Sequence, residues 1–241
     1  MAGTKEMNHH SAPENLISPE KHALTIPFIT ISGPSGTGKT ETGRRLSEAL
    51  GIPSDNFIKT GDLFRKEMER RGLQVMGFVK REIDFDESLD RRQANIMREA
   101  TVDNPFILEG RLAGVINKEL QINGEKLNGV SLLFICDQDE RERRLINRER
   151  NKGKTSEQII QENFERDTED FGQWQKIHPI LEGKTTDELS KELYGASAAD
   201  EDGNRHNELY DFVVDTTHRS IAEVADFMIE QFALKGYTRL K

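Results

Sequence analysis

Five short apolar runs along the chain have the continuous hydrophobicity that is typical of strands buried on both faces of a sheet. These runs cover residues 26–32, 56–60, 105–110, 131–137 and 210–216. Between them, apolar positions recur with a helical period, most clearly in residues 40–51, 62–72, 86–100 and 220–236. Because strands and helices alternate, the pattern predicts an α/β fold with a parallel sheet and right-handed crossovers.

Three segments depart from this alternation. Residues 1–25 are polar and lack sustained periodicity, so we expect a disordered leader followed by a domain over 26–241. Within the domain, residues 60–95 and 138–209 are long inserts, and residues 182–209 look partly loop-like. Long inserts on a compact core are often lids or binding loops.

The overall charge limits the class of partner. The 241-residue chain has a net charge of −9, which argues against a general nucleic-acid binder. Its apolar runs fall short of the ~20 residues of a membrane span, and the first 25 residues lack the apolar segment of a signal peptide. We therefore expect a cytoplasmic monomer without a membrane or nucleic-acid partner.

The strongest local signal is the stretch "GPSGTGKT" between the first strand and the first helix, which fits G-x-x-x-x-G-K-[ST] in the context that this motif requires. The expected phosphate-binding residues are Gly33, Ser35, Gly36, Thr37, Gly38, Lys39 and Thr40. Glycines let successive N–H groups turn toward a phosphate, Lys39 brings a charge, and Thr40 offers a hydroxyl to Mg²⁺. The alternative is a tight turn without a ligand, but the motif favours ATP and Mg²⁺ as cofactors.

Two further stretches place charged residues beside this loop. In "TGDLFR", Asp62 and Arg65 lie one helical turn apart, and an arginine fork suits a phosphate; Asp62 could equally be only a helix cap. In "LEGR", Glu109 ends a predicted central strand, where an acid can hold the water shell of magnesium. Arg111 follows at once.

Arginines also recur in the second insert. Arg141, Arg144 and Arg148 have the spacing of one helix face, and Arg166 follows a second helical pattern. Such a run is commonly a solvated surface. It would also suit a lid that supplies positive charge to a phosphoryl-transfer transition state and shields it from water.

Taken together, "GPSGTGKT", "TGDLFR", "ESLDRRQ", "LEGRLAG" and "YDFVVDTT" resemble the nucleoside monophosphate kinases, and especially the cytidylate kinases of the short archaeal-type branch. The likeness covers roughly residues 27–170 and 210–235. It implies a P-loop NTPase-type three-layer fold with a five-stranded parallel sheet. It also implies a monophosphate-binding insert near 60–95 and an arginine lid near 140–180.

The resemblance also implies roles for individual residues. Substrate-binding positions would be Asp62, Arg65, Asp90, Arg91, Arg92 and Arg111. Catalytic positions would be Lys39, Arg111, Arg148 and Arg166, with Arg144 on ATP, and Thr40 and Glu109 on the metal. The chain departs from the family at Gln173, where a basic residue is usual and Lys176 or Lys184 could substitute, and in an insertion around 171–190.

The expected reaction is transfer of the γ-phosphoryl group of ATP to a pyrimidine nucleoside monophosphate, CMP or dCMP. An alternative is a P-loop kinase for another phosphate-bearing acceptor, such as AMP, UMP or another metabolite. A nucleotide-dependent switch is a third reading. The N-K-x-D guanine motif of GTPases is not matched by the nearest string, residues 117–120.

Overall fold

The computed structural model describes residues 22–73, 82–148, 151–195 and 205–240. Its centre is a parallel sheet in the strand order β3-β4-β2-β5-β6. The five strands are β2 (Phe28–Ser32), β3 (Phe57–Lys59), β4 (Phe106–Glu109), β5 (Val130–Ile135) and β6 (Phe212–Asp215). Four lie within the apolar runs and β5 begins one residue before its run, so the predicted five-stranded parallel sheet is confirmed, with shorter strands than the runs themselves.

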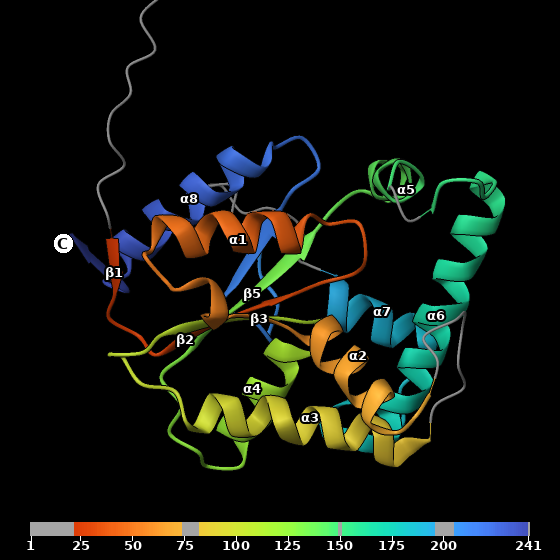
Figure 1. Cartoon of the computed structure of the whole chain (residues 1–241), viewed down its shortest axis with the longest axis horizontal. Coiled ribbons are helices and arrows are strands. Elements are labelled where there is room, and N and C mark those ends of the chain that lie inside the picture. Colours follow the sequence, from red (N-terminus) through yellow and green to blue (C-terminus); the bar gives the residue numbers. More distant parts are fainter. Residues whose placement is uncertain (1–21, 74–81, 149–150, 196–204, 241) are drawn as a thin grey trace, which may run out of the picture.

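Helices cover both faces of the sheet, which explains why the strands are apolar throughout (Figure 1). One face packs against α1 (Lys39–Ala49) and α8 (Ile221–Leu234), and the other against α3 (Ile83–Arg98) and α4 (Ala113–Ile122). The inserts contribute α2 (Thr60–Arg70), α5 (Gln138–Ile146), α6 (Ser156–Ile177), α7 (Thr186–Tyr194) and the short 3₁₀ helix η3 (Pro179–Leu181), whereas the 3₁₀ helix η1 (Ser54–Asn56) lies between α1 and β3.

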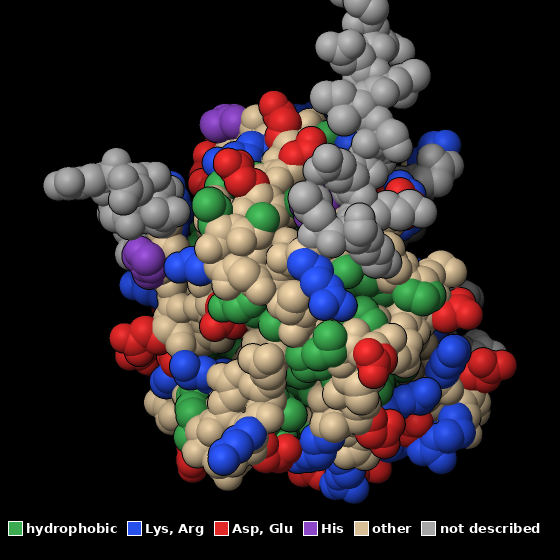
Figure 2. Space-filling model, turned by 90° about the vertical axis from the view of Figure 1, so that its left-hand side faces the viewer, with side chains coloured by type: hydrophobic (Ala, Val, Ile, Leu, Met, Phe, Trp, Pro, Cys, Tyr) green, Lys and Arg blue, Asp and Glu red, His purple; other side chains and the backbone are tan. Residues whose placement is uncertain are grey.

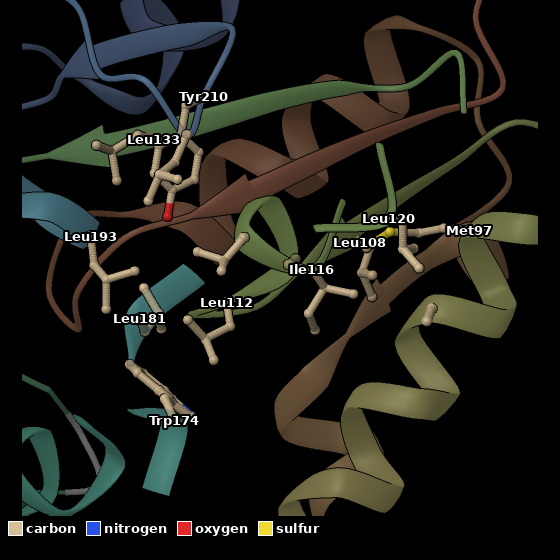
Figure 3. Packing of buried hydrophobic residues seen from close by; sticks show 14 of the residues in the cluster. Met97, Leu108, Leu112, Ile116, Leu120, Leu133, Trp174, Leu181, Leu193 and Tyr210 are labelled. Carbon is tan, nitrogen blue, oxygen red and sulfur yellow. The ribbon is translucent and has the colours of Figure 1, made fainter. Parts of the chain in front are cut away.

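Successive strand residues enter opposite halves of the core. Ile29 and Ile107 are partners across β2 and β4, and both face the α1/α8 layer. Phe28 and Leu108 face the other layer, where Figure 3 shows Leu108 close to side chains of α3 and α4. Because β2 and β4 pair in parallel, their carboxyl ends lie at the same edge of the sheet, the edge from which α1 begins.

The second insert is more regular than its sequence suggested. We expected residues 182–209 to be partly loop-like; α7 occupies Thr186–Tyr194, and residues 196–204 lie outside the described residues. Thr185 and Glu188 form a reciprocal capping box at its start, a signal that is readable in "TTDE". The side chains of Leu189 and Leu193 are buried in the core, and Figure 3 shows Leu193 among the packed side chains. Part of the insertion therefore completes the core.

A second, smaller sheet lies at the opposite end of the domain. β1 (His22–Leu24) pairs antiparallel with β7 (Thr238–Leu240). The ordered region thus begins before residue 26, whereas residues 1–21 of the expected leader lie outside the described residues. Basic and acidic side chains are interleaved on this side of the molecule (Figure 2). Within the described residues, none of the helices is both long and apolar enough to span a membrane.

Candidate active site

The turn between β2 and α1 closes around its own lysine. Lys39 is 8% exposed, and its Nζ donates hydrogen bonds to the carbonyl oxygens of Gly33 (2.8 Å) and Pro34 (2.7 Å). Burial lowers the pKa of Lys39 to about 8, and the nearby carboxylate of Glu109 offsets only part of that effect. A buried ammonium group beside the start of α1 gives the turn the charge that a polyphosphate requires.

Helix α5 forms the outer wall of this turn. Gly36 has a φ of +98°, and a Cβ placed there would lie 2.5 Å from Cγ of Arg141. Arg144 of the same helix donates to the carbonyl oxygen of Thr216 (2.7 Å), and the hydroxyl of Thr216 donates to the carbonyl oxygen of Thr37 (3.2 Å). The guanidinium of Arg144 is therefore held behind the turn and lies outside the lining of the cavity described below. Its expected contact with ATP stays a prediction.

Thr40 and Glu109 meet across the sheet edge. The hydroxyl of Thr40 donates a hydrogen bond of 3.0 Å to Oε2 of Glu109. A hydroxyl beside a carboxylate is an all-oxygen donor set, which is the kind that Mg²⁺ prefers. The two residues, 69 positions apart in the chain, meet because β2 and β4 are adjacent strands and end at the same edge.

One cavity of about 870 Å³ opens at this edge, and it contains eleven of the residues expected from the sequence. They are Ser35, Gly36, Gly38, Lys39, Thr40, Arg65, Asp90, Glu109, Arg111, Arg148 and Arg166. Six other expected residues lie outside its lining: Gly33, Thr37, Asp62, Arg91, Arg92 and Arg144. The tertiary structure thus gathers residues from the phosphate loop and from both inserts around a single space.

Arg65 reaches this cavity from α2, with Asp62 as its partner. Because α2 already begins at Thr60, Asp62 lies in the first turn instead of capping the helix, and the possible capping role is not observed. Its carboxylate pairs with Arg65 and with Nζ of Lys59 (3.0 Å). Although burial acts in the opposite direction, hydrogen bonds from these two cations hold the pKa of Asp62 below its usual value. Asp62 thus orients Arg65 from behind.

Arg111 lies where β4 ends and crosses to helix α6. Its guanidinium donates hydrogen bonds to the carboxylates of Asp167 and Asp170, and its Cζ lies 5.4 Å from the ring centroid of Trp174. Burial alone would lower the pKa of Arg111, but the neighbouring acidic groups raise it above the ordinary arginine value. The positive charge is therefore permanent, and it fastens α6 to the sheet edge.

The two expected lid arginines reach the cavity by different routes. Helix α5 ends at Ile146, so Arg148 lies beyond it and does not share the predicted helix face with Arg141 and Arg144. Arg166 lies within α6, with its Nε 3.9 Å from Oδ2 of Asp170.

Gln173, at which the chain departs from the family pattern, and the two lysines that could substitute for a basic residue there do not line the cavity. Gln173 is buried, and Lys184 bonds to the carbonyl of Ile180 (2.9 Å) and pairs with Glu192. Within the described part of the chain, neither Lys176 nor Lys184 lines the cavity, so neither takes the place of the basic residue that the family usually has at position 173.

The sequence identified only part of the cavity lining. The lining also includes residues that sequence reasoning did not select: Lys59, Thr60, Phe64, Met68, Asp86, Leu89, Gln93, Leu112, Asp170 and Trp174. On α3, Asp86, Asp90 and Gln93 follow helical spacing on one face, whereas Arg91 and Arg92 are exposed and point away from that lining. The motif "ESLDRRQ" carried the signal, but its residues Leu89, Asp90 and Gln93, not its arginines, line the cavity.

A family model described as an AAA domain matches residues 32–161, more than half of the chain. The cytidylate kinase of Methanothermobacter thermautotrophicus is 32% identical over 156 residues, 64% of this chain and 86% of that protein. The cytidylate kinase of Methanobrevibacter smithii is 38% identical over 89 residues, 36% of this chain, and the match spans about half of that relative (48%).

A solved structure with the same fold is the gluconokinase of Sinorhizobium meliloti 1021. Its TM-score is 0.50 and its sequence identity is 14%, over 87% of this chain and 94% of the gluconokinase. At that identity the likeness supports the fold alone. From the phosphate loop, the sheet order and the similarity that spans 86% of an archaeal relative, the chain belongs to the P-loop nucleoside monophosphate kinase family of phosphotransferases, and within it resembles the cytidylate kinases.

Proposed function

We propose that the protein transfers the γ-phosphoryl group of ATP to CMP or dCMP. The observation that carries this proposal is the single cavity that Lys39, Arg65 and Arg111 line together. Two arginines besides those of the lid suit an acceptor that already bears a phosphate. A plain alcohol acceptor would not need them.

In the proposed reaction, an oxygen of the acceptor phosphate forms a bond to the γ-phosphorus, and the bond from that phosphorus to the β–γ bridging oxygen breaks. ADP leaves and CDP or dCDP forms. Lys39, Arg148 and Arg166 neutralise charge on the transferring group, while Arg65 and Arg111 aim the acceptor oxygen. A general base is not needed, because a phosphate monoester has a second pKa of about 6 and is mostly ionised at neutral pH. Catalysis then rests on positioning and electrostatics.

Thr40 and Glu109 fit the proposed magnesium cofactor through their adjacent oxygens. When bound, the ion neutralises negative charge on the nucleotide phosphates. The chain's own contribution is to hold the Thr40 hydroxyl and the Glu109 carboxylate at the end of adjacent strands, beside Lys39.

The composition of the acceptor end supports a base that carries an amino group. Asp86 and Asp90 on α3 line it together with the apolar side chains of Phe64 and Leu89. An ionised carboxylate can only accept hydrogen bonds. The exocyclic amino group of cytosine donates such bonds, whereas the corresponding oxygen of uracil cannot. This chemistry favours CMP over UMP, and it gives AMP, which also carries an amino group, as the main competitor.

A coupled assay of ADP release across CMP, dCMP, UMP, AMP and GMP tests the proposal. We expect the highest kcat/KM with CMP or dCMP and a much lower value with UMP. Preference for AMP or for another acceptor would replace the proposed substrate. Hydrolysis of ATP without phosphorylation of any acceptor would favour the nucleotide-switch alternative.

A further inference from the structure

His178 follows the last residue of α6 and is buried between two carboxylates. It is 3% exposed. Its Nδ1 lies 2.6 Å from Oε2 of Glu119 on α4, and its Nε2 lies 3.1 Å from Oδ2 of Asp90 on α3. One imidazole ring therefore joins the lid helix to two helices of the core, and one of its partners lines the cavity.

The geometry requires a charged ring. A neutral imidazole has a single N–H, so only the doubly protonated form can donate to both carboxylates at once. Burial would lower the pKa of His178, but the hydrogen bonds that the ring donates to Asp90 and Glu119 raise it to about 9. The other charged side chains beside the ring are Glu87, Arg91 and Arg98 of α3, which line the shallow groove outside it.

Hydrogen bonds connect Asp90 to two other residues that line the cavity. Its Oδ1 accepts from Nε2 of Gln93 (3.0 Å), and Oε1 of Gln93 accepts from the hydroxyl of Thr60 (2.9 Å). A Cβ at Gly110 would lie 2.2 Å from that hydroxyl, so the end of the chain has little room to shift. Asp90, Gln93 and Thr60 all line the cavity. The ring thus anchors a continuous polar chain from α4 to α2.

We propose that His178, as an imidazolium, is the residue that positions Asp90 and Gln93 for the nucleoside part of the acceptor. This inference rests on the proposed function and deepens it. Without the ring, Asp90 loses its charged partner and can rotate away from the cavity. The lost contacts belong to acceptor binding, because Asp90 and Gln93 lie on α3 and are not part of the phosphate loop, Gly33 to Thr40. The kinetic signature is therefore a raised KM for CMP with kcat and the KM for ATP little changed.

His178→Gln removes the charge and leaves a single donor nitrogen, the side-chain amide, in place of the two ring nitrogens. We expect the KM for CMP to rise about tenfold or more, the size of a lost hydrogen bond to a charged group. In the wild type, the KM for CMP rises as the pH passes about 9, whereas in His178→Gln it stays flat. Glu119→Gln leaves the contact to Asp90 but removes one carboxylate, so the pH at which KM rises moves lower. A merely structural role would not produce that shift.

Circular dichroism melts check that each variant folds. An imidazole NMR titration, in which the His178→Gln spectrum identifies the missing resonance, reports the ring directly and needs no turnover. A KM for CMP within about twofold of wild type in folded His178→Gln, or a rise in the KM for CMP near pH 9 that persists in this variant, overturns the inference. If the wild type phosphorylates none of the nucleotides, the proposed function fails, and the inference falls with it.

Discussion

Asp170 of the lid helix accepts a hydrogen bond from the guanidinium of Arg111, 59 residues earlier in the chain. Asp167 takes a second hydrogen bond from the same guanidinium, and the ring of Trp174 lies against it. An acceptor phosphate that binds Arg111 must share it with these two carboxylates. The position of α6 is therefore coupled to occupancy of the acceptor site through one arginine.

This coupling makes Trp174 a reporter, because it is the only tryptophan in the chain. We expect CMP to cause a saturable change in tryptophan emission, since the phosphate draws on the guanidinium that lies 5.4 Å from the ring centroid. A fluorescence titration measures it, with free tryptophan plus CMP as the control for light absorption. Emission that stays constant at CMP concentrations that saturate the kinetics would argue against the contact.

Arg65→Ala is expected to raise the KM for CMP by about tenfold or more while changing the KM for ATP little, because a charge-assisted contact to the acceptor phosphate is lost. Arg70→Ala is the matched control: it lies on the same helix, is 67% exposed and pairs with Glu67 outside the cavity. Steady-state kinetics with each substrate varied in turn separates the two. Equal effects of both variants would reject the placement of Arg65 in the acceptor site.

Lys39→Ala should reduce turnover to background, because the ammonium group at the phosphate loop is removed from the reaction centre. The variant also loses the hydrogen bonds to Gly33 and Pro34, so a thermal melt must accompany the assay. Lys66→Ala, at an exposed position of α2, serves as the control for loss of a lysine. Substantial turnover by folded Lys39→Ala would remove Lys39 from the mechanism.

Two helical glycines should respond oppositely to alanine. A Cβ at Gly114 of α4 would lie 2.4 Å from the buried ring of Tyr210, whereas one at Gly172 of α6 would meet nothing within 4 Å. We expect Gly114→Ala to destabilise the fold by about 1–3 kcal/mol through overpacking. Gly172→Ala should stabilise it by about 0.5–1 kcal/mol through helix propensity. Urea unfolding measures both, and a destabilised Gly172→Ala would contradict the open environment.

Stability should fall in alkaline solution because of His178. Its pKa is raised from 6.5 to about 9 in the folded state, so its contribution is complete below pH 6.5 and is lost as the pH rises through 9. The difference corresponds to a free energy of unfolding on the order of 3 kcal/mol. Denaturant unfolding between pH 6 and 10 should show this decline in the wild type and a smaller one in His178→Gln. Parallel curves for the two proteins would contradict it.

Much of this protein was readable from the sequence because the relevant patterns are local. Continuous apolar runs identify buried parallel strands, and the phosphate loop depends on eight consecutive residues, Gly33 to Thr40, whose backbone conformation is set by their own glycines. Arg65 was assigned to the phosphate-binding site because it lies three residues, about one helical turn, after Asp62 in the motif "TGDLFR". Helix α7 lies in a segment that we expected to be partly loop-like, yet the capping box at its start is a local signal between Thr185 and Glu188.

The rest depended on packing between distant segments. Arg111 meets Asp167 56 residues later, and His178 meets Asp90 across 88 residues; sequence spacing alone does not determine such a distance. The rotation of α3 decides that Asp90 and Gln93 line the cavity while Arg91 and Arg92 face outward. Local sequence thus determined the elements and the phosphate loop, but only the tertiary structure decided which charges meet, because those contacts arise when helices far apart in the chain pack together.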